Sequence, residues 1–591
     1  MAMLRMAWTL RIVAAVLFCA ALSACVAGGG AGASRGDTVV ISIVGTNDVH
    51  GQLLPADGKG GLSTLSGYVA ALRAARRADG GVLLVDAGDM WQGTLESNLN
   101  EGAAVVEAYN ALGYAAAALG NHEFDFGPAG DLAVPADALD DPRGALKQRA
   151  REANFPLLAA NVIDVSTNAP ISWDNFRPST VVDVAGVRIG IIGVLTKGAL
   201  YTTIAANTVG LRIDPLAESI TREARMLRTA GANLIVVVAH AGSRCSEFED
   251  PHDLSSCDTT GEFSGEIMQV ANALPTGLVD HIIGGHVHQG VAHFVNDVAV
   301  TSSYSGTRAF SRVDFTVNRG DGRVLQREIF PPQQLCPAVN PSGNECVWMS
   351  ADADAAVPAR YEGRTIEPDA NIVAIANRAG ARAAEIRTQK LGVVLDTPFT
   401  LDGNPESPLA NLVTDALYQS LDADIVFHNA AGGLRAPLPE GELTYGSVYT
   451  MFPFDNRVAI LELSGADLRL IIAGQAHAGR RRAAFAGMRV FVDCSDGGMR
   501  VTMRLGDGQE IKDTDVLRVG ANDFLATGGD DILTPAMPDG GFVIDDDPRL
   551  IREIIVGWLR NSGPRLHAQQ FQDEAGRRWN LPDSLPATCT L

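Results

Sequence analysis

Residues 115–125 read AAAALGNHEFD, an apolar run that ends in a glycine and a cluster of polar side chains. The run Ala115–Leu119 has the length and apolarity of a short buried strand, and Gly120 lets the backbone turn sharply after it. The amide, imidazole and carboxylate groups that follow are all groups that bind metal ions or move protons. This stretch therefore predicts a buried strand whose end carries functional residues.

Four further apolar runs between residues 38 and 330 end in the same way, and helical stretches such as Leu62–Ala78 lie between them. This alternation predicts an α/β domain, in which ligands bind beyond the carboxyl ends of the strands. A single histidine after a strand is most often a surface or core residue, but five such groups predict a site for divalent ions such as zinc or manganese. Val39–Val44 leads to Asp48 and His50, Val82–Val85 to Asp89, Leu234–Val238 to His240, and Ile282–Ile283 to His286 and His288.

The set Asp-x-His, Gly-Asp, Gly-Asn-His-Glu, a single His and Gly-His-x-His resembles the calcineurin-like metallophosphoesterases. The sequences of residues 46–51 (TNDVHG) and 120–125 (GNHEFD) resemble those of the 5′-nucleotidases, which are one branch of these enzymes. This resemblance covers nearly all of the mature chain. It implies an α/β (α+β) fold: a four-layer β-sandwich with flanking helices, a linker helix, and a second α/β domain that binds substrate.

The resemblance also implies two divalent metal ions that share one bridging carboxylate. Two such ions lower the pKa of a shared water, so that hydroxide can attack at neutral pH. The first ion is expected on Asp48, His50, Asp89 and His288, and the second on Asp89, Asn121, His240 and His286.

His122 and Asp125 remain outside this ligand set, and the resemblance implies that they act in catalysis. We expect His122 to donate to a phosphoryl or leaving oxygen while Asp125 holds the other ring nitrogen. A spacing of three residues lets the two side chains meet on a helical turn. The alternative for Asp125 is a carboxylate that stabilises a helix N-terminus. Glu123 is expected to be structural.

The resemblance places substrate recognition in the second domain, where two aromatic rings would stack on a nucleobase and an Asp would bind ribose. The alternative for each phenylalanine is ordinary core packing. Two features depart from the family pattern: one extra residue stands between Asn429 and Arg435, and residues 402–405 offer no arginine. The expected substrate-binding residues are Asn429, Arg435, Phe454, Asn456, Phe524 and Asp530.

The amino terminus is typical of an export signal. Arg5 and Arg11 precede an apolar stretch, 12–22, that is too short to span a bilayer, and Ser23-Ala24-Cys25 follows. The pattern resembles a bacterial lipoprotein signal with Cys25 as the lipid-bearing residue, and the alternative is an ordinary secretory signal. Either alternative predicts an exported protein, in the periplasm or on the outer membrane, and the lipoprotein alternative alone attaches it to a membrane, through Cys25.

The chain divides into a signal, a tether and two domains. Pro331-Pro332 is expected to close the first domain, and a helix at Ile372–Gln389, with Asn371 as its N-cap, is expected to link the halves. The expected segments are a signal at 1–25, a tether at 26–37, a metallophosphoesterase domain at 38–335, a linker at 336–390 and a substrate-binding domain at 391–591.

Six cysteines lie beyond the signal, an even number that favours disulfides in an exported chain. Six cysteines allow 15 pairings, so the sequence leaves the connectivity open. Pairing of nearest neighbours gives Cys245–Cys257, Cys336–Cys346 and Cys494–Cys589.

Composition narrows the function. A net charge of −22 over 591 residues argues against a nucleic-acid polymer as partner, because such binding needs a basic surface. A small anionic substrate remains possible, because bound cations reverse the local potential. The resemblance implies hydrolysis of nucleoside 5′-monophosphates. The alternatives are a 2′,3′-cyclic nucleotide phosphodiesterase and 3′-nucleotidase, a nucleotide-sugar hydrolase, a related sulfur-oxidation thiohydrolase, or a surface lipoprotein without catalysis.

Overall fold

A computed structural model describes residues 37–591 with some gaps. The predicted signal and nearly all of the tether lie outside the described residues, as do residues 402–404. The gaps are 57, 131–134, 136–138, 262–263, 344, 349–355, 401–404, 480–481, 496–497, 539–541, 543–544, 573–576, 583–584 and 587–588.

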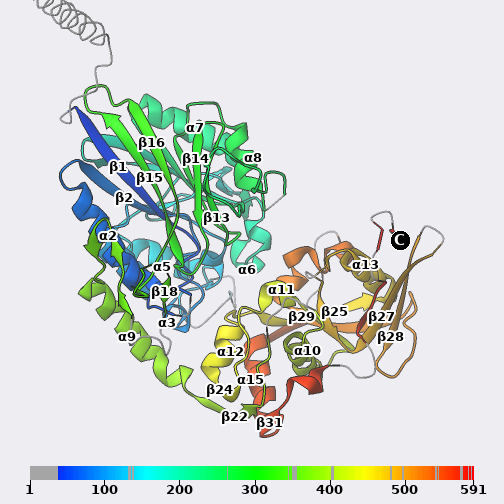
Figure 1. Ribbon diagram of the computed structural model, residues 1–591. Helices are drawn as coiled ribbons and strands as arrows, with labels where there is room; N and C mark the ends of the chain where they lie inside the picture. The colour runs from blue at the N-terminus through cyan, green and yellow to red at the C-terminus, as the bar shows by residue number, and fades with distance from the viewer. Residues whose placement is uncertain are drawn as a thin grey trace, which may run out of the picture.

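Two large β-sheets form the centre of the first domain (Figure 1). The seven-stranded sheet has the order β16 (Val324–Gln334), β15 (Ala309–Asn318), β1 (Thr38–Thr46), β2 (Gly80–Asp86), β3 (Ala116–Ala118), β4 (Leu157–Leu158) and β7 (Phe176–Arg177). The six-stranded sheet has the order β13 (Gly290–Val295), β14 (Val298–Ser303), β12 (His281–Gly284), β11 (Leu234–His240), β9 (Val187–Leu195) and β8 (Ser179–Val184).

The two sheets pack face to face through side chains such as Ile41, Leu83, Ile189 and Val236, all buried in one cluster. Helices cover both outer faces, which makes four layers, and the strands read as continuous apolar runs because both of their faces are buried. The predicted fold class is therefore confirmed. The covering helices are α2 (Gly61–Arg76), α4 (Ala103–Leu112) and α5 (Gly144–Glu152) on one side and α7 (Leu216–Thr229) and α8 (Glu266–Ala273) on the other.

Pro331 and Pro332 lie within the last strand of the first domain and not in a loop beyond it. Strand β16 continues through both prolines to Gln334, paired only with β15 at the edge of the seven-stranded sheet. A proline lacks the N–H that a central strand needs, but at an edge this donor is dispensable. The prolines therefore mark an edge strand.

The linker helix is present as α9 (Ala370–Arg387), but its predicted N-cap is wrong. Asp369 caps the helix, because its side chain accepts from the backbone N–H groups of Asn371 and Ile372. Asn371 is already inside the first turn. An Asp and an Asn two residues apart are both good caps, and the backbone decides between them.

Helix α9 joins the two domains (Figure 1). It packs against α3 (Leu95–Asn98) and α4 of the first domain and against α12 (Tyr445–Met451) of the second. Ala383 is buried between Leu95 and Tyr449, so one small residue of the linker contacts both halves. Arg378 and Arg387 pair with Glu107 and Glu96 of the first domain.

The second domain is built on a five-stranded sheet of the order β26 (Ala484–Ala486), β23 (Ile425–His428), β29 (Val516–Asn522), β25 (Arg457–Ser464) and β30 (Asp545–Leu550). Helices α10 (Pro408–Ser420) and α15 (Ile551–Asn561) pack together beside it. Ser407 caps α10 by accepting from Ala410, and Pro408 occupies the first helical position, which needs no N–H.

Three disulfides join the six cysteines beyond the signal as the nearest-neighbour pairing predicts: Cys245–Cys257, Cys336–Cys346 and Cys494–Cys589. The first two close short loops, and the third fastens the C-terminal segment to β27 (Met488–Ser495). Within the described part of the chain, every helix is too short or too polar to cross a membrane.

Candidate active site

The first cluster of polar side chains contains Asp48, His50 and His288, and its atoms lie close enough to hold one ion. The Nε2 atoms of His50 and His288 are 3.0 Å apart, and His288 Nε2 is 3.4 Å from Asp48 Oδ1. Asp48 follows β1 and His288 follows β12, so the two sheets each contribute to one group.

The second cluster contains Asp89, His240 and His286, with the amide of Asn121 among them. His240 Nε2 lies 3.1 Å from Asp89 Oδ2 and 2.9 Å from Asn121 Oδ1, and His286 Nδ1 lies 3.1 Å from the same amide oxygen. Asp89 also lies toward the first cluster, 4.0 Å from His50 Nε2. The structure thus brings together all seven residues expected to bind metal.

The backbone is strained at most of these residues. Non-glycine residues rarely adopt a positive φ, because the Cβ atom then approaches the following carbonyl oxygen at a cost of about 1–2 kcal/mol each. Residues that do so are concentrated at functional sites. Five of the seven have this conformation: Asp48 (50°), His50 (49°), Asp89 (57°), His286 (73°) and His288 (58°).

The donor atoms are oriented as metal ligands need to be. His240 and His50 each place Nδ1 at 2.9 Å from a backbone carbonyl, of Ala87 and Gln92, so that the lone pair of Nε2 points into the cluster. The amide of Asn121 donates to the carbonyl of Thr202 and thereby turns its oxygen inward. Buried carboxylate, imidazole and amide oxygen donors of this kind fit borderline divalent ions.

The pKa values of the histidines in the two clusters agree with a metal-binding role. Burial lowers the pKa of His50 and of His286 to about 3, which keeps both rings neutral, as ligands must be. Burial would also lower the pKa of His240, but the Asp89 carboxylate outweighs it and raises the value to about 10. A cation between His240 and Asp89 would take the place of that proton. The residues therefore fit a metal pair.

Glu123 supports the site from behind. Its buried carboxylate accepts from the backbone N–H groups of Gly120, Asp89 and Met90 at 2.7–2.9 Å. It therefore joins the loop that carries Asn121 to the loop that carries Asp89. This agrees with a structural role for Glu123.

Replacing Glu123 with Gln is expected to destabilise the fold and loosen the metal site. The amide would present a donor where the carboxylate now accepts from backbone N–H groups, and an unmade buried hydrogen bond costs about 1–3 kcal/mol. Thermal unfolding of metal-loaded protein should show a lower midpoint and weaker protection by added metal. An unchanged midpoint would mean that these three hydrogen bonds contribute little.

His122 and Asp125 meet beside the clusters. Asp125 Oδ2 lies 2.6 Å from His122 Nδ1, and Asp125 Oδ1 accepts from the Thr203 hydroxyl at 2.7 Å. Burial would lower the pKa of His122, but the Asp125 and Asp89 carboxylates raise it above its usual value. The pair lies on a 3-10 turn, η1 (His122–Phe124), so the spacing of three residues brings the side chains together as predicted.

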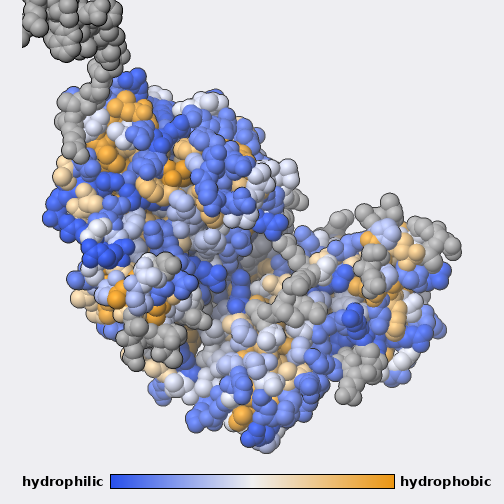
Figure 2. Space-filling view, viewed as in Figure 1, coloured by the Kyte–Doolittle hydropathy of each residue, from blue (hydrophilic) through white to orange (hydrophobic). Residues whose placement is uncertain are grey.

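One cleft of about 790 Å³ connects this site to the second domain. Figure 2 shows the surface hollowed between the two halves. All six residues expected to bind substrate line this cleft, together with His122 and Asp125. Gln92 and Pro453 also line the cleft, and the Gln92 amide joins the two domains by donating to the carbonyl of Pro453 at 3.2 Å.

Phe454 lies against the catalytic pair. Its ring stacks on His122, with centroids 5.8 Å apart, and the Arg435 guanidinium lies 5.1 Å from its centroid. Arg435 is exposed as a residue, but desolvation of its guanidinium by the cleft wall lowers its pKa despite the carboxylates nearby. Phe524 packs against Gly529, in the second loop that carries residues expected to bind substrate. The face of Phe454 that lies on His122 is therefore covered in this structure.

The polar residues of the pocket form a network of their own. Asn429 Nδ2 donates to Asp530 Oδ2 at 2.7 Å, and Asn522 donates to Asn429 at 3.2 Å. Asn456 donates to Asp523 at 2.9 Å. Sequence reasoning missed Gln92, Thr203 and Asn522, and no motif distinguishes these residues from ordinary loop residues.

Two family models match the chain. Residues 41–290 match calcineurin-like phosphoesterase, and residues 386–537 match the 5′-nucleotidase C-terminal domain, in the order that the structure shows. Together they cover more than half of the chain. The chain belongs to the 5′-nucleotidase family. It is thus a member of a family of phosphoester hydrolases.

Relatives of this 5′-nucleotidase family member are distant but cover most of its length. It is 27% identical to endonuclease YhcR of Bacillus subtilis over 83% of this chain, and spans only 37% of that protein. It is 24% identical to protein UshA of Yersinia enterocolitica, over 90% of this chain and 93% of the relative.

Solved structures share the fold. The 5′-nucleotidase precursor from Thermus thermophilus aligns over 92% of this chain and all of that one, with a TM-score of 0.67 and 23% identity. The sulfate thiohydrolase SoxB of the same species aligns over 92% and 97%, with a TM-score of 0.61 and 15% identity. Since proteins named for different chemistries share this fold, the fold does not identify the substrate.

Proposed function

We propose that this protein is an exported hydrolase that releases phosphate from nucleoside 5′-monophosphates with the help of two divalent ions, zinc, manganese or similar. One observation supports this most: two clusters of metal-binding side chains, a His–Asp pair and a set of aromatic and polar side chains line a single cleft. The relatives named 5′-nucleotidase agree with it. We propose that attachment to a membrane, if any, is through Cys25.

The ions would lie between the side chains that already converge. One ion would be held by Asp48, His50 and His288. The other ion would be held by Asn121, His240 and His286. Asp89 would be a ligand of both. When bound, such ions neutralise phosphoryl oxygens and activate water at neutral pH.

The protein's own side chains would supply the remaining catalytic and phosphate-binding groups. His122 is held by Asp125 through Nδ1, so Nε2 is the ring nitrogen that can donate to a phosphoryl or leaving oxygen. Thr203 fixes Asp125 and thereby the direction of the ring. Arg435, on the wall of the cleft, would offer a guanidinium to the phosphate or its ester oxygen.

Substrate choice is proposed to depend on the second domain. Phe454 and Phe524 would stack on the two faces of a base, and Asp530, oriented by Asn429, would accept from ribose hydroxyls. Asn456 would lie beside the base.

Phosphate release from a panel of substrates tests the proposal. The panel contains 5′-, 3′- and 2′,3′-cyclic nucleotides, a nucleotide sugar and p-nitrophenyl phosphate, each with manganese, zinc or EDTA. We expect the highest kcat/KM with 5′-monophosphates and loss of activity in EDTA that added metal restores. A preference for cyclic, 3′- or sugar nucleotides would replace the proposed substrate, and no turnover of any ester would refute the hydrolase.

Replacing Phe454 with Ala is expected to raise KM for AMP about tenfold, because stacking on one base is worth about 1–3 kcal/mol. KM for p-nitrophenyl phosphate, which has no base, should change much less. The matched control is Phe491→Ala, an exposed phenylalanine on β27. Equal effects on both substrates would show that Phe454 acts by covering His122 and not by holding a base.

A further inference from the structure

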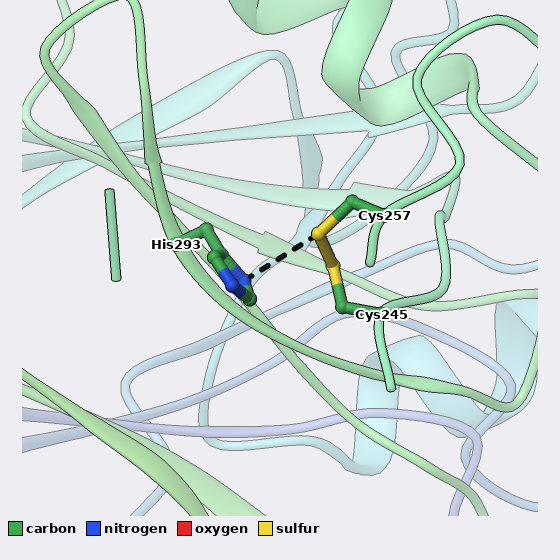
Figure 3. A group of neighbouring side chains, drawn as sticks. All are labelled: Cys245, Cys257 and His293. Carbon is green, nitrogen blue, oxygen red and sulfur yellow. Dashed lines mark hydrogen bonds between the residues drawn. A yellow bond between two sulfur atoms is a disulfide. The ribbon is translucent and has the colours of Figure 1, made fainter. Parts of the chain in front are cut away.

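Besides the two clusters of the cleft, the described residues hold one more group of side chains of metal-binding type, Cys245, Cys257 and His293 (Figure 3). In Figure 3 the ring of His293, on β13, points at Cys257, whose sulfur lies 3.7 Å from Nδ1. Because both sulfurs are in the disulfide, this trio carries no ion here. Arg552, a buried arginine of the second domain, by contrast contacts the loop that carries Phe454.

This loop, residues 452–456, brings Phe454 and Asn456 to the wall of the cleft. It runs from the end of α12 to the start of β25, and all five of its described residues lie outside helices and strands. Because no ladder of backbone hydrogen bonds orients such a loop, its peptide groups take their direction from the partners they find elsewhere. The direction of the Phe454 ring therefore depends on what holds the carbonyl groups of this loop.

The start of α15 provides these partners. Ile551, the first residue of the helix, has an N–H that the helix itself cannot use, and it donates to Asn456 O at 2.9 Å. Arg552 Nη1 donates to Phe454 O at 2.9 Å, and its Nη2 forms an ion pair with Asp455. Two consecutive residues of the helix thus hold three consecutive residues of the loop.

The guanidinium of Arg552 is itself fixed in place. Arg552 is 5% exposed and is not among the residues that line the cleft. Its Nε donates to the Tyr445 hydroxyl at 3.3 Å, and its Cζ lies 4.4 Å from the centroid of the Tyr449 ring, both on α12. Each of its three nitrogens therefore has a partner, which the planar fork of a guanidinium allows and a single ammonium does not.

We infer that Arg552 is a positioning residue for substrate recognition, which holds the carbonyl of Phe454 and thereby fixes the ring of Phe454 for stacking on a nucleobase. The inference rests on the proposed function and deepens it. Arg552 acts through Phe454 and does not touch the substrate, so its removal should weaken the binding of substrates that carry a base and spare those without one. A purely structural ion pair would affect both kinds of substrate alike.

Steady-state kinetics with AMP and p-nitrophenyl phosphate test this role in Arg552→Met and Arg552→Lys. Methionine keeps much of the apolar stem and removes every hydrogen bond, while Asp455, with a side chain that is 32% exposed, stays in contact with water. We expect Arg552→Met to raise KM for AMP about tenfold, the factor expected for loss of one stacked face, with kcat and KM for p-nitrophenyl phosphate little changed. Lysine should give a smaller rise, because its ammonium can still donate to the carbonyl.

The matched control is Arg560→Met, an exposed position on the same helix, which should behave like the wild type. Thermal unfolding of each variant shows whether it is folded at the assay temperature. If Arg552→Met is not, Arg552→Lys takes its place in every comparison, with the smaller rise expected.

A double-mutant cycle with Phe454→Ala separates positioning from a structural role. If Arg552 acts through the Phe454 ring, Arg552→Met should cause no further rise in KM for AMP once that ring is gone. Independent effects that multiply, an equal rise with both substrates, or an unchanged KM for AMP would each overturn the role of Arg552 and leave the proposed function standing. Wild-type protein that hydrolyses p-nitrophenyl phosphate but not AMP would refute the proposed function itself.

Discussion

Asp89→Asn is expected to reduce phosphate release by about three orders of magnitude, which corresponds to about 4 kcal/mol of transition-state stabilisation. The Asp89 carboxylate lies between the two clusters, 3.1 Å from His240 Nε2 and 4.0 Å from His50 Nε2. Its Oδ1 accepts from His122 N at 2.9 Å. The amide has nearly the same size but no charge, so both proposed ions lose their shared ligand while the local packing remains.

Steady-state kinetics and elemental analysis of the same preparation check this expectation. Asp183→Asn, an exposed position on β8, is the matched control and should behave like the wild type. Activity of Asp89→Asn within tenfold of the wild type at saturating metal would contradict a bridging role for Asp89.

His122→Ala is expected to lower kcat by about 10²–10⁴-fold, the range for removal of a positioned general acid, while metal content stays unchanged. The reason is geometric: the His122 ring lines the cleft, and Asp125 binds its Nδ1 at 2.6 Å, whereas the ring is in neither metal cluster. Asp125→Asn should cost less, because the imidazole itself remains.

The surface of the second domain offers a matched control. His567 also pairs with a carboxylate, Asp396, at 2.8 Å, but outside the residues that line the cleft. His567→Ala should leave kcat unchanged. If His122→Ala also left kcat unchanged, or if it removed the metal, His122 would not be the acid.

The sequence predicted that these seven side chains converge, because their convergence depends on local pattern and on sheet geometry. Each ligand follows an apolar strand, and the carboxyl ends of neighbouring strands lie together in such sheets. The parallel pairs β1–β2, β2–β3 and β11–β12 accordingly bring Asp48, Asp89, Asn121, His240 and His286 to one place. The resemblance implied the His122–Asp125 pair, and the spacing of three residues allowed the contact that the structure shows.

Contacts between residues that are far apart in the sequence could not be predicted. Phe454 packs on His122, and Gln92 donates to Pro453, across more than three hundred residues of chain. No local pattern encodes how two domains sit against each other. The same holds for Pro331 and Pro332, because only the completed sheet shows that β16 is an edge strand.

Metal stoichiometry measured on catalytically active protein tests the central claim most directly. After removal of loosely bound ions, elemental analysis should find two transition-metal ions per chain, and a chelator should remove the ions and the activity together. Active protein that contains no metal and is indifferent to chelation would contradict the account.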